Sequence, residues 1–352
     1  MSGKREDKAY LDPLPGWISE QADVISEMLS KNGRAQFGPF SDSFRQLVNM
    51  VDQLPDSTTT FEIYKIDARA LSAFFGDSLS ALAHACEALI GRWAFQHAHK
   101  FASALKGFRF GLEDGNFLLS FSCARSMFEE VAHFHFFLCR FEASFRKMSK
   151  LLERQGALLD KGKDPSKEAT SEYIETQLEL IQRLVKALEG SDYDWSGWFK
   201  TTAESSGFDW NDYLSKHAPL RKTHINDCIR ALEAKAIPAQ RVYDLFSEMV
   251  HPNFGSNTLV VSTRTRKNEI SGDLILSARP KNAEAAAWFF ELAAFPLTLT
   301  FETEISCTHR AQTMLQFYMH FSQLMQENAL FHSSTRGLRT PGPGKSANGK
   351  IQ

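Results

Sequence analysis

Apolar residues recur at three- and four-residue intervals along most of this 352-residue chain, the pattern of helices that bury one face. Gly33–Phe40 is expected to be a loop. A kink or break is expected at Pro296, because proline removes a helical hydrogen bond. The pattern predicts helices at Trp17–Lys31, Ser43–Leu54, from about Asp67 toward Leu105, Asn116–Leu159, Ser171–Leu188, Arg221–Lys235, Ala239–Val250 and Asn282–Asn328. The fold class is therefore predicted to be mainly α, a multi-helix bundle.

Two segments depart from the helical pattern. Thr258–Arg264 and Gly272–Ala278 have β-type sequences joined by Thr265–Ser271, which predicts a small β-hairpin insertion at about 258–278. The residues from Ser333 onward are rich in Gly, Pro, Ser and Lys and contain no acid, which predicts a disordered, basic C-terminal tail. We accordingly expect an N-terminal helical region at 1–110, a core helical bundle at 111–332 and a tail at 333–352.

The predicted helix Asn116–Leu159 is apolar on every side in its first part. A helix of this kind belongs at the centre of a bundle. Its ionisable side chains then lie at least partly buried, where a lone charge is costly and needs a partner. These side chains are Arg125, Glu129, Glu130, His133 and His135.

The overall charge gives little guidance to a partner. The formal net charge is −2 at pH 7, so attraction to nucleic acid requires a local basic patch. The C-terminal tail is one candidate patch. The predicted hairpin region is the other, with Arg264, Arg266, Lys267, Arg279 and Lys281. Charged side chains in such runs are more often simply solvated.

Cysteine usage and hydropathy indicate the compartment. The five cysteines are widely spaced and form no Cys-x-x-Cys pair, which is typical of reduced thiols in a cytosol. Met1–Tyr10 is charged and polar rather than a targeting signal. The longest apolar run, Ala285–Phe301, is short for a spanning helix and is interrupted by Glu291. We expect a cytoplasmic protein with no membrane partner.

The most informative polar pattern is Tyr243-x3-Ser247-x3-His251-Pro252, at the end of a predicted helix. Residues four apart are neighbours on a helix, so the first three side chains form one row. Proline disfavours helical backbone in the preceding residue, which places His251 at or near the C-cap. There the carbonyl end of the helix dipole favours imidazolium, so His251 is the best candidate for titration. The alternative is a histidine that only caps the helix.

Arg125 and Glu129 are also four apart and can pair along the central helix. If this helix packs against the helix ending at His251, Glu129 can hold the imidazole while Arg125 clamps an anion. The candidate catalytic residues are then Arg125, Glu129, Tyr243, Ser247 and His251. The alternative is a buried ion pair that only specifies the register of two packed helices.

Arg125-x3-Glu129, together with the motif ending at Pro252, resembles an uncharacterised family of bacterial all-helical proteins that is distantly HEPN-like. The resemblance covers about Asn116–Asn328. Many HEPN proteins are RNases of defence and stress systems. The resemblance therefore implies an all-helical fold, binding or cleavage of RNA, and a role in phage defence or stress response.

Active HEPN RNases carry an Arg-x4–6-His motif, in which the His acts on the 2′-hydroxyl and the Arg on the phosphate. Arg92-x4-His97 fits this spacing. A chain of this composition contains about two such matches by chance. Trp93 also stands where a polar residue is usual, so this match does not by itself identify an RNase.

The Glu-x-x-His pattern of di-iron carboxylate bundles occurs twice, as Glu130-x2-His133 and Glu248-x2-His251. Glu87 can supply a further metal ligand. Chance predicts about 0.75 occurrences of the pattern in such a chain. A proline directly after the second pattern argues against it, because these ligands normally lie within continuous helix. No cofactor is predicted; a di-iron site on these residues is the alternative.

Three functional hypotheses follow. The first is a cytoplasmic HEPN-like protein that binds or cleaves RNA. The second is a non-catalytic helical interaction or scaffold protein with a protein partner, in which the same polar residues only lock the bundle. The third is a di-iron carboxylate oxidase. Assembly into a homo-oligomer is compatible with each of them.

Overall fold

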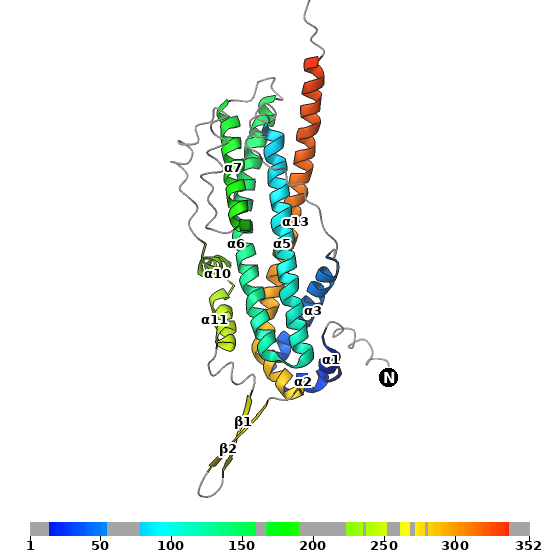
Figure 1. The fold of residues 1–352 in the computed structure, drawn as a ribbon, viewed down its shortest axis with the longest axis vertical. Coiled ribbons are helices and arrows are strands. Elements are labelled where there is room, and N and C mark those ends of the chain that lie inside the picture. Colours follow the sequence, from blue (N-terminus) through cyan, green and yellow to red (C-terminus); the bar gives the residue numbers. More distant parts are fainter. Residues whose placement is uncertain are drawn as a thin grey trace, which may run out of the picture.

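The computed structural model describes residues 14–54, 78–159, 167–189, 223–234, 237–251, 261–267, 272–278 and 281–337. Its helices are α1 (Gly16–Glu20), α2 (Ala22–Met28), α3 (Lys31–Asp52), α5 (Ser78–Asp114), α6 (Phe117–Leu159), α7 (Lys167–Glu189), α10 (Ile225–Glu233), α11 (Ala239–Val250) and α13 (Ala283–Gly337). Its strands are β1 (Val261–Lys267) and β2 (Gly272–Ala278). The described part of the chain is therefore mainly α, as predicted (Figure 1).

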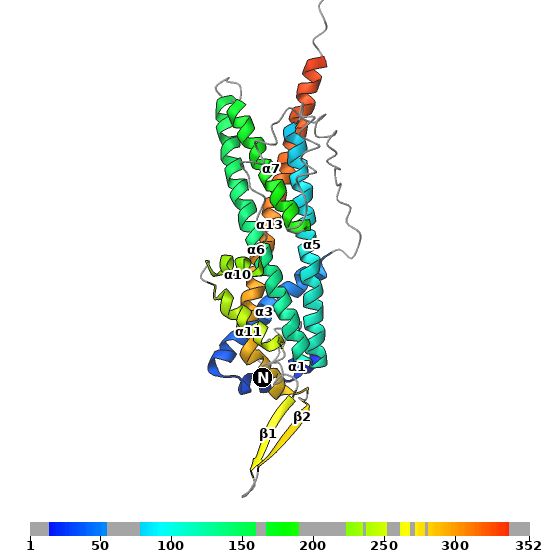
Figure 2. The same ribbon diagram turned by 60° about the vertical axis from the view of Figure 1, so that its left-hand side comes forward.

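The long helices α5, α6 and α13 run side by side along an elongated molecule (Figures 1 and 2). α7 packs against α5 and α6 at one end, whereas α10 and α11 pack against α6 further along. α3 packs against α13. A hydrophobic cluster with residues from all of these helices forms the core, so the elements are parts of one packed body.

α6 is the central helix, as its apolar sequence predicts. It packs against α5, α7, α10, α11 and α13. Its fully buried aromatic side chains are Phe117, Phe121, Phe128, Phe134, Phe137 and Phe141. Burial of each such ring stabilises the fold by roughly 1.5–3 kcal/mol. The polar residues of α6 are therefore held on a rigid element.

The junction between α5 and α6 depends on glycine. Gly115 has a φ of 73°, a left-handed conformation that glycine adopts without steric cost. Gly111 lies where α5 approaches α6 closely: a Cβ atom there would lie 2.9 Å from the backbone nitrogen of Ser120. The two helices can therefore touch through their backbones.

The expected loop at Gly33–Phe40 is wrong, because these residues belong to α3. The interruption lies at Ser30, whose hydroxyl accepts a hydrogen bond from the Gly33 N–H at 3.0 Å and caps the helix. Glu291 of α13 accepts bonds from the Ser30 N–H at 3.0 Å and from its hydroxyl at 2.6 Å. The Phe40 ring packs 5.3 Å from that of Phe290, and such tertiary contacts outweigh the weak local helix propensity.

α13 is not broken at Pro296, which lies inside a continuous helix. The helix there is buried, with Leu297 and Phe301 fully enclosed. The Thr300 hydroxyl donates to the Pro296 carbonyl at 2.8 Å. α13 also continues past Asn328 to Gly337, beyond the expected start of the tail; residues 338–352 lie outside the described residues.

β1 and β2 pair antiparallel, from Val261 opposite Ala278 to Lys267 opposite Gly272. β1 includes residues 265–267, which were predicted to belong to the turn, whereas the predicted strand residues 258–260 lie outside the described residues. Residues 268–271 lie outside the described residues, so the hairpin as a whole stays a prediction.

α5 runs without interruption across the predicted boundary between residues 110 and 111, and that division also stays a prediction. The predicted helix start near Asp67 falls in residues 55–77, outside the described residues. No helix in the described part of the chain has both the length and the apolar character needed to cross a membrane.

Candidate functional site

α11 presents the predicted row of polar side chains beside α6. Its buried face carries Phe246, whose ring lies 6.4 Å from that of Phe121 and 6.0 Å from that of Phe128. His251 is the C-cap, with φ −69° and ψ 147°, and its N–H donates to the Ser247 carbonyl at 3.0 Å. The C-cap position predicted from the following proline is confirmed.

Arg125 joins the two halves of the candidate site. Its Nε donates to Glu129 Oε1 at 3.0 Å along α6. Its Nη2 donates to the Tyr243 hydroxyl at 3.2 Å, and its Nη1 lies 3.4 Å from His251 Nε2. The guanidinium carbon also lies 5.4 Å from the centroid of the Tyr243 ring. Four of the five candidate residues therefore converge, although α6 and α11 are far apart in sequence.

Among the described residues the printed contact of the His251 imidazole on this side is with Arg125, which also bonds Glu129, so the expectation that Glu129 holds the imidazole stays a prediction. A guanidinium N–H can donate to Nε2 only when that nitrogen carries no proton, so the role of His251 in this contact depends on the tautomer of its ring. Burial works against the charge of Arg125, but its hydrogen bonds to Glu129 and Tyr243 outweigh burial and raise the pKa of the guanidinium. Arg125 therefore stays cationic beside the His251 ring.

Ser247 completes the row between Tyr243 and His251. Its hydroxyl oxygen is buried and has no hydrogen-bond partner among the described residues. An unsatisfied buried polar group costs about 1–3 kcal/mol. Within the described part of the chain, Ser247 is therefore an unsatisfied polar group on the α11 row, and its oxygen is closed to solvent.

The Arg125 cluster, comprising Arg125, Glu129, Tyr243, Ser247 and His251, lies at the surface rather than in a sealed core. The side chains of Arg125 and Glu129 are 22% and 35% exposed, and His251 is exposed. An anion approaching from solvent can therefore reach a cationic fork, a phenol and an imidazole without opening the bundle.

A second polar cluster is buried between α5 and α13. His97 is 5% exposed and Glu304 is 3% exposed, and the imidazole Nε2 lies 2.9 Å from the carboxylate Oε2. The other ring nitrogen lies 3.8 Å from Glu130 of α6, and the ring stacks on Phe134 at 3.7 Å between centroids. Thr308 donates to Glu304 at 3.0 Å. His97 therefore links three helices.

Burial opposes the imidazolium of His97, but attraction to Glu304 and hydrogen bonds to both carboxylates outweigh it and raise the pKa of His97 to about 9. Burial also opposes the carboxylate of Glu130, yet its hydrogen bond to His97 and the nearby Lys100 lower its pKa. At neutral pH the cluster is therefore a charged, paired network.

This second cluster was not predicted, and Arg92-x4-His97 does not account for it. Residues five apart lie about 140° apart around a helix, and His97 meets Glu304, Glu130 and Phe134 instead. The sequence did contain a signal for this cluster. Glu304 lies three residues from the buried Phe301 and three from the buried Cys307, so it shares their apolar helical face and needs a buried partner.

The di-iron alternative is not supported by the arrangement of its ligands. Among the described residues, no group of three or more His, Cys, Asp or Glu side chains could hold a metal ion. Glu130 lies with His97 and Lys100, whereas His251 lies with Arg125 and Glu248 is exposed. Burial lowers the pKa of His133, which fits a core histidine.

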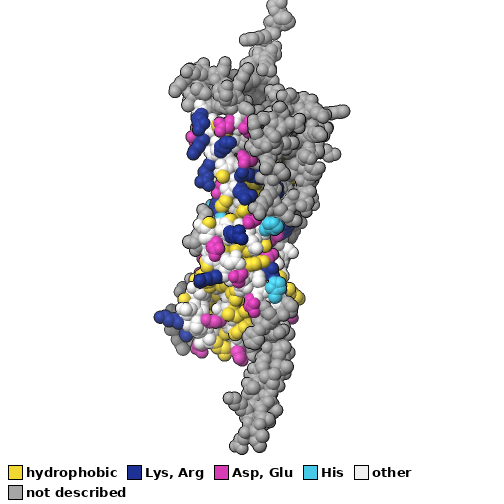
Figure 3. Space-filling model, turned by 90° about the vertical axis from the view of Figure 1, so that its left-hand side faces the viewer, with side chains coloured by type: hydrophobic (Ala, Val, Ile, Leu, Met, Phe, Trp, Pro, Cys, Tyr) yellow, Lys and Arg dark blue, Asp and Glu magenta, His cyan; other side chains and the backbone are white. Residues whose placement is uncertain are grey.

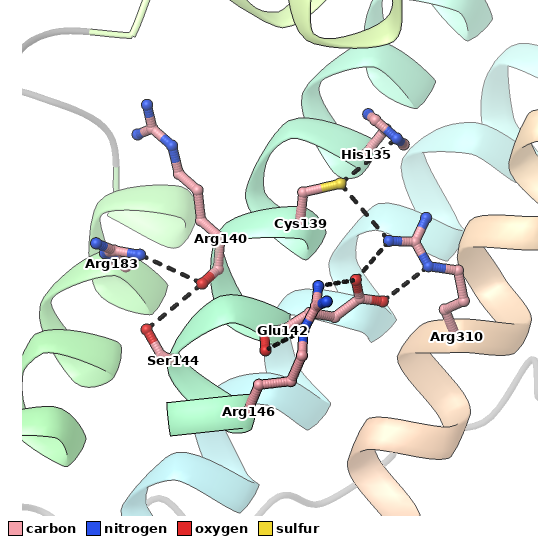
Figure 4. Close-up of polar contacts among 8 residues, drawn as sticks. All are labelled: His135, Cys139, Arg140, Glu142, Ser144, Arg146, Arg183 and Arg310. Carbon is pink, nitrogen blue, oxygen red and sulfur yellow. Dashed lines mark hydrogen bonds and ion pairs between the residues drawn. The ribbon is translucent and has the colours of Figure 1, made fainter. Parts of the chain in front are cut away.

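A third cluster ties α6 to α13 (Figure 4). The Arg310 guanidinium donates two hydrogen bonds of 2.7 Å to the Glu142 carboxylate, and its Nη2 lies 3.6 Å from the Cys139 sulfur. The bonds to Glu142 raise the pKa of Arg310. None of the five cysteines forms a disulfide. Burial raises the pKa of Cys228 and of Cys307 to about 12, so these two thiols stay protonated at neutral pH.

Comparison with known proteins adds no relative. No protein-family model matches the chain, and neither the curated proteins nor the solved structures contain a match. The all-helical fold is consistent with the resemblance to a helical family, and the HEPN-like assignment itself stays a prediction.

Proposed function

We propose that the protein binds RNA and that the Arg125 cluster contacts a phosphate of the RNA backbone. The observation that carries the proposal is the convergence of two side chains on Arg125 at the surface. The Arg125 guanidinium lies 3.2 Å from the Tyr243 hydroxyl and 3.4 Å from His251 Nε2. A guanidinium presents several N–H groups in one plane, and this geometry matches phosphate oxygens.

Cleavage of the bound RNA is the catalytic form of this proposal. In this step the Arg125 Nη1 turns from His251 Nε2 to the phosphate, Nε2 of a neutral His251 takes the proton of a ribose 2′-hydroxyl, and the resulting oxygen attacks the adjacent phosphorus. The bond from phosphorus to the 5′-oxygen breaks, and that oxygen leaves with a proton from the Tyr243 phenol or from water. Arg125 stabilises the negative charge that develops on the phosphoryl oxygens.

The test separates cleavage from binding. Labelled RNA is incubated with wild-type protein, His251→Ala and Arg241→Gln, the last being an exposed α11 control outside the cluster. Cleavage in wild type and in Arg241→Gln but not in His251→Ala supports catalysis. Binding without cleavage by all three proteins restricts the proposal to RNA binding, and absence of both from wild type overturns it.

The second candidate function is a non-catalytic interaction protein. The observation in its favour is that the Arg125 guanidinium already contacts Glu129, Tyr243 and His251. The contacts with Tyr243 and His251 join α11 to α6. In that case, substitutions in the cluster lower the free energy of unfolding and leave RNA unaffected. The two functions are separated by whether the cluster variants change stability or RNA binding.

A further inference from the structure

The second half of α6 has a basic exposed side. Among the exposed described residues between positions 140 and 154, five are basic, one is acidic and one is Ala143. The basic residues are Arg140, Arg146, Lys147, Lys150 and Arg154. Figure 3 views the side where α6, α7, α10 and α11 lie in Figure 1, and Lys and Arg side chains lie over its upper part with Asp and Glu side chains among them. This region is the local patch that an overall charge of −2 requires for any nucleic-acid binding.

Four of these cations form one row. Arg140, Lys147, Lys150 and Arg154 are separated by seven, three and four residues, spacings that keep side chains on one side of a helix. The row, here called the α6 basic stripe, extends about 21 Å at the helical rise of roughly 1.5 Å per residue. Over such a length a nucleic-acid duplex carries on the order of ten phosphates.

The neighbouring acids neutralise little of the stripe. Glu142 is held by two hydrogen bonds from Arg310 on the α13 side. Glu153 is the exposed acid of this segment. Asp227 of α10 lies near Arg140 and pairs with Arg230 at 4.0 Å. Lys147, Lys150 and Arg154 form no ion pair with a described residue, so their charges face solvent.

The side chains around the stripe favour a nucleic acid over other anionic partners. A helix that lies on a membrane needs exposed large apolar residues beside its cations. The exposed large hydrophobic residues in the described part of the chain are Val24, Met28, Phe110, Phe295 and Met319, none of which is on α6. For the same reason the described part of the stripe offers no aromatic platform for stacked bases. The contacts available are therefore with the sugar–phosphate backbone.

We infer that the α6 basic stripe binds the phosphate backbone of RNA without reading its sequence. This inference rests on the proposed RNA-binding function and specifies its substrate class: an RNA segment long enough to cover the stripe, rather than a nucleotide. The positive row on α6 adds affinity that depends on salt concentration, and the Arg125 cluster engages a single phosphate.

The test is the salt dependence of RNA binding. The dissociation constant of a labelled RNA hairpin is measured by fluorescence anisotropy between about 50 and 200 mM KCl, where counterion release dominates. Each phosphate contact contributes roughly 1 to the slope of log affinity against log salt, so Lys147→Gln/Lys150→Gln should lower the slope by about 2. Lys147→Arg/Lys150→Arg keeps the charge and should retain the wild-type slope.

The control is Lys31→Gln/Lys106→Gln, which makes the same charge change at exposed positions on α3 and α5. If the Gln variants of the stripe and of the control have equal salt slopes, the inference that the α6 basic stripe binds RNA is overturned, and the proposed function is not affected. Absence of RNA binding by wild type overturns both. Stripe-dependent binding to phosphatidylserine vesicles or to polyglutamate, with RNA binding unchanged, assigns the stripe to a membrane or an acidic protein and overturns the inference.

Discussion

The Nη1 of Arg125 lies 3.4 Å from Nε2 of His251, although 126 residues separate them in the chain. The contact exists because α11 docks through Phe246 on the central helix and ends at His251 with an extended C-cap. A surface-accessible cation and an imidazole thus meet at a helix end, and the proposed chemistry depends on this pairing.

Removal of the Tyr243 hydroxyl tests how strongly the cluster fastens α11. Tyr243→Phe keeps the ring but deletes the acceptor of the Arg125 hydrogen bond, so we expect a loss of about 0.5–1.5 kcal/mol in the free energy of unfolding. Urea denaturation monitored by circular dichroism measures it. A loss above about 3 kcal/mol would favour the structural-lock function, because such values accompany the breaking of a buried charge network.

The Arg125–Glu129 pair should contribute little to stability. Its side chains are 22% and 35% exposed, so solvent screens the attraction, and a helical pair of this spacing is worth about 0.3–0.5 kcal/mol. A double-mutant cycle of Arg125→Ala and Glu129→Ala measures the coupling energy. Coupling of several kcal/mol would show that the cluster is effectively buried.

The His97–Glu304 pair predicts a pH-dependent stability. The pKa of His97 is raised from 6.5 to about 9 in the folded protein, because its carboxylate partners outweigh burial. The folded state therefore binds the proton more tightly, and this stabilisation is fully present below pH 6.5 and is lost as the pH rises through about 9. Urea denaturation of wild type at pH 6 to 10 should show the free energy of unfolding falling as the pH rises from 6.5 toward 9.

The matched control is His97→Gln, which removes the titrating group. Its stability should be lower at neutral pH but should vary less across the same window. Glu304→Gln removes the nearer carboxylate and leaves Glu130 at 3.8 Å, so it should cost less than the about 3–5 kcal/mol expected when a buried pair is broken completely. Identical pH profiles for wild type and His97→Gln would refute the assignment of the charge to His97.

The α5–α6 contact predicts opposite effects of one substitution at two glycines. Gly111→Ala places a methyl group 2.9 Å from the Ser120 nitrogen and should destabilise the fold by about 1–3 kcal/mol. Gly16→Ala at the start of α1 meets no atom within 4 Å and should raise the free energy of unfolding by roughly 0.4–1 kcal/mol. Thermal denaturation of both variants checks the pair. Equal melting temperatures would show that α5 and α6 are not in backbone contact.

The central position of α6 and the α11 side of the Arg125 cluster follow from local sequence patterns. The all-round apolar sequence identifies α6 as the central helix, and four-residue spacing gives the row from Tyr243 to His251. The convergence with Arg125 was also predictable, because a charged residue on a buried helix needs a partner. Which side chain touches the imidazole was not, since the rotamers of Arg125 and Glu129 depend on packing.

The remaining features depend on residues that are distant in sequence. α3 is helical through Gly33 and Pro39 because Ser30 caps the helix and Phe40 packs on Phe290, contacts that local propensity cannot reveal. His97 and Glu304 are 207 residues apart, and the sequence around each of them does not indicate its partner. Their pairing is decided by the alignment of α5 with α13.

The most direct measurement of the central claim is the affinity of wild type, Arg125→Gln and Arg241→Gln for one labelled RNA at fixed salt. A charged hydrogen bond to phosphate is worth about 1.5–3 kcal/mol, so Arg125→Gln should bind roughly 10- to 100-fold more weakly, whereas Arg241→Gln should match wild type. Circular dichroism checks that both variants are folded. Equal affinity of the two variants, or no RNA binding by wild type, would contradict the account.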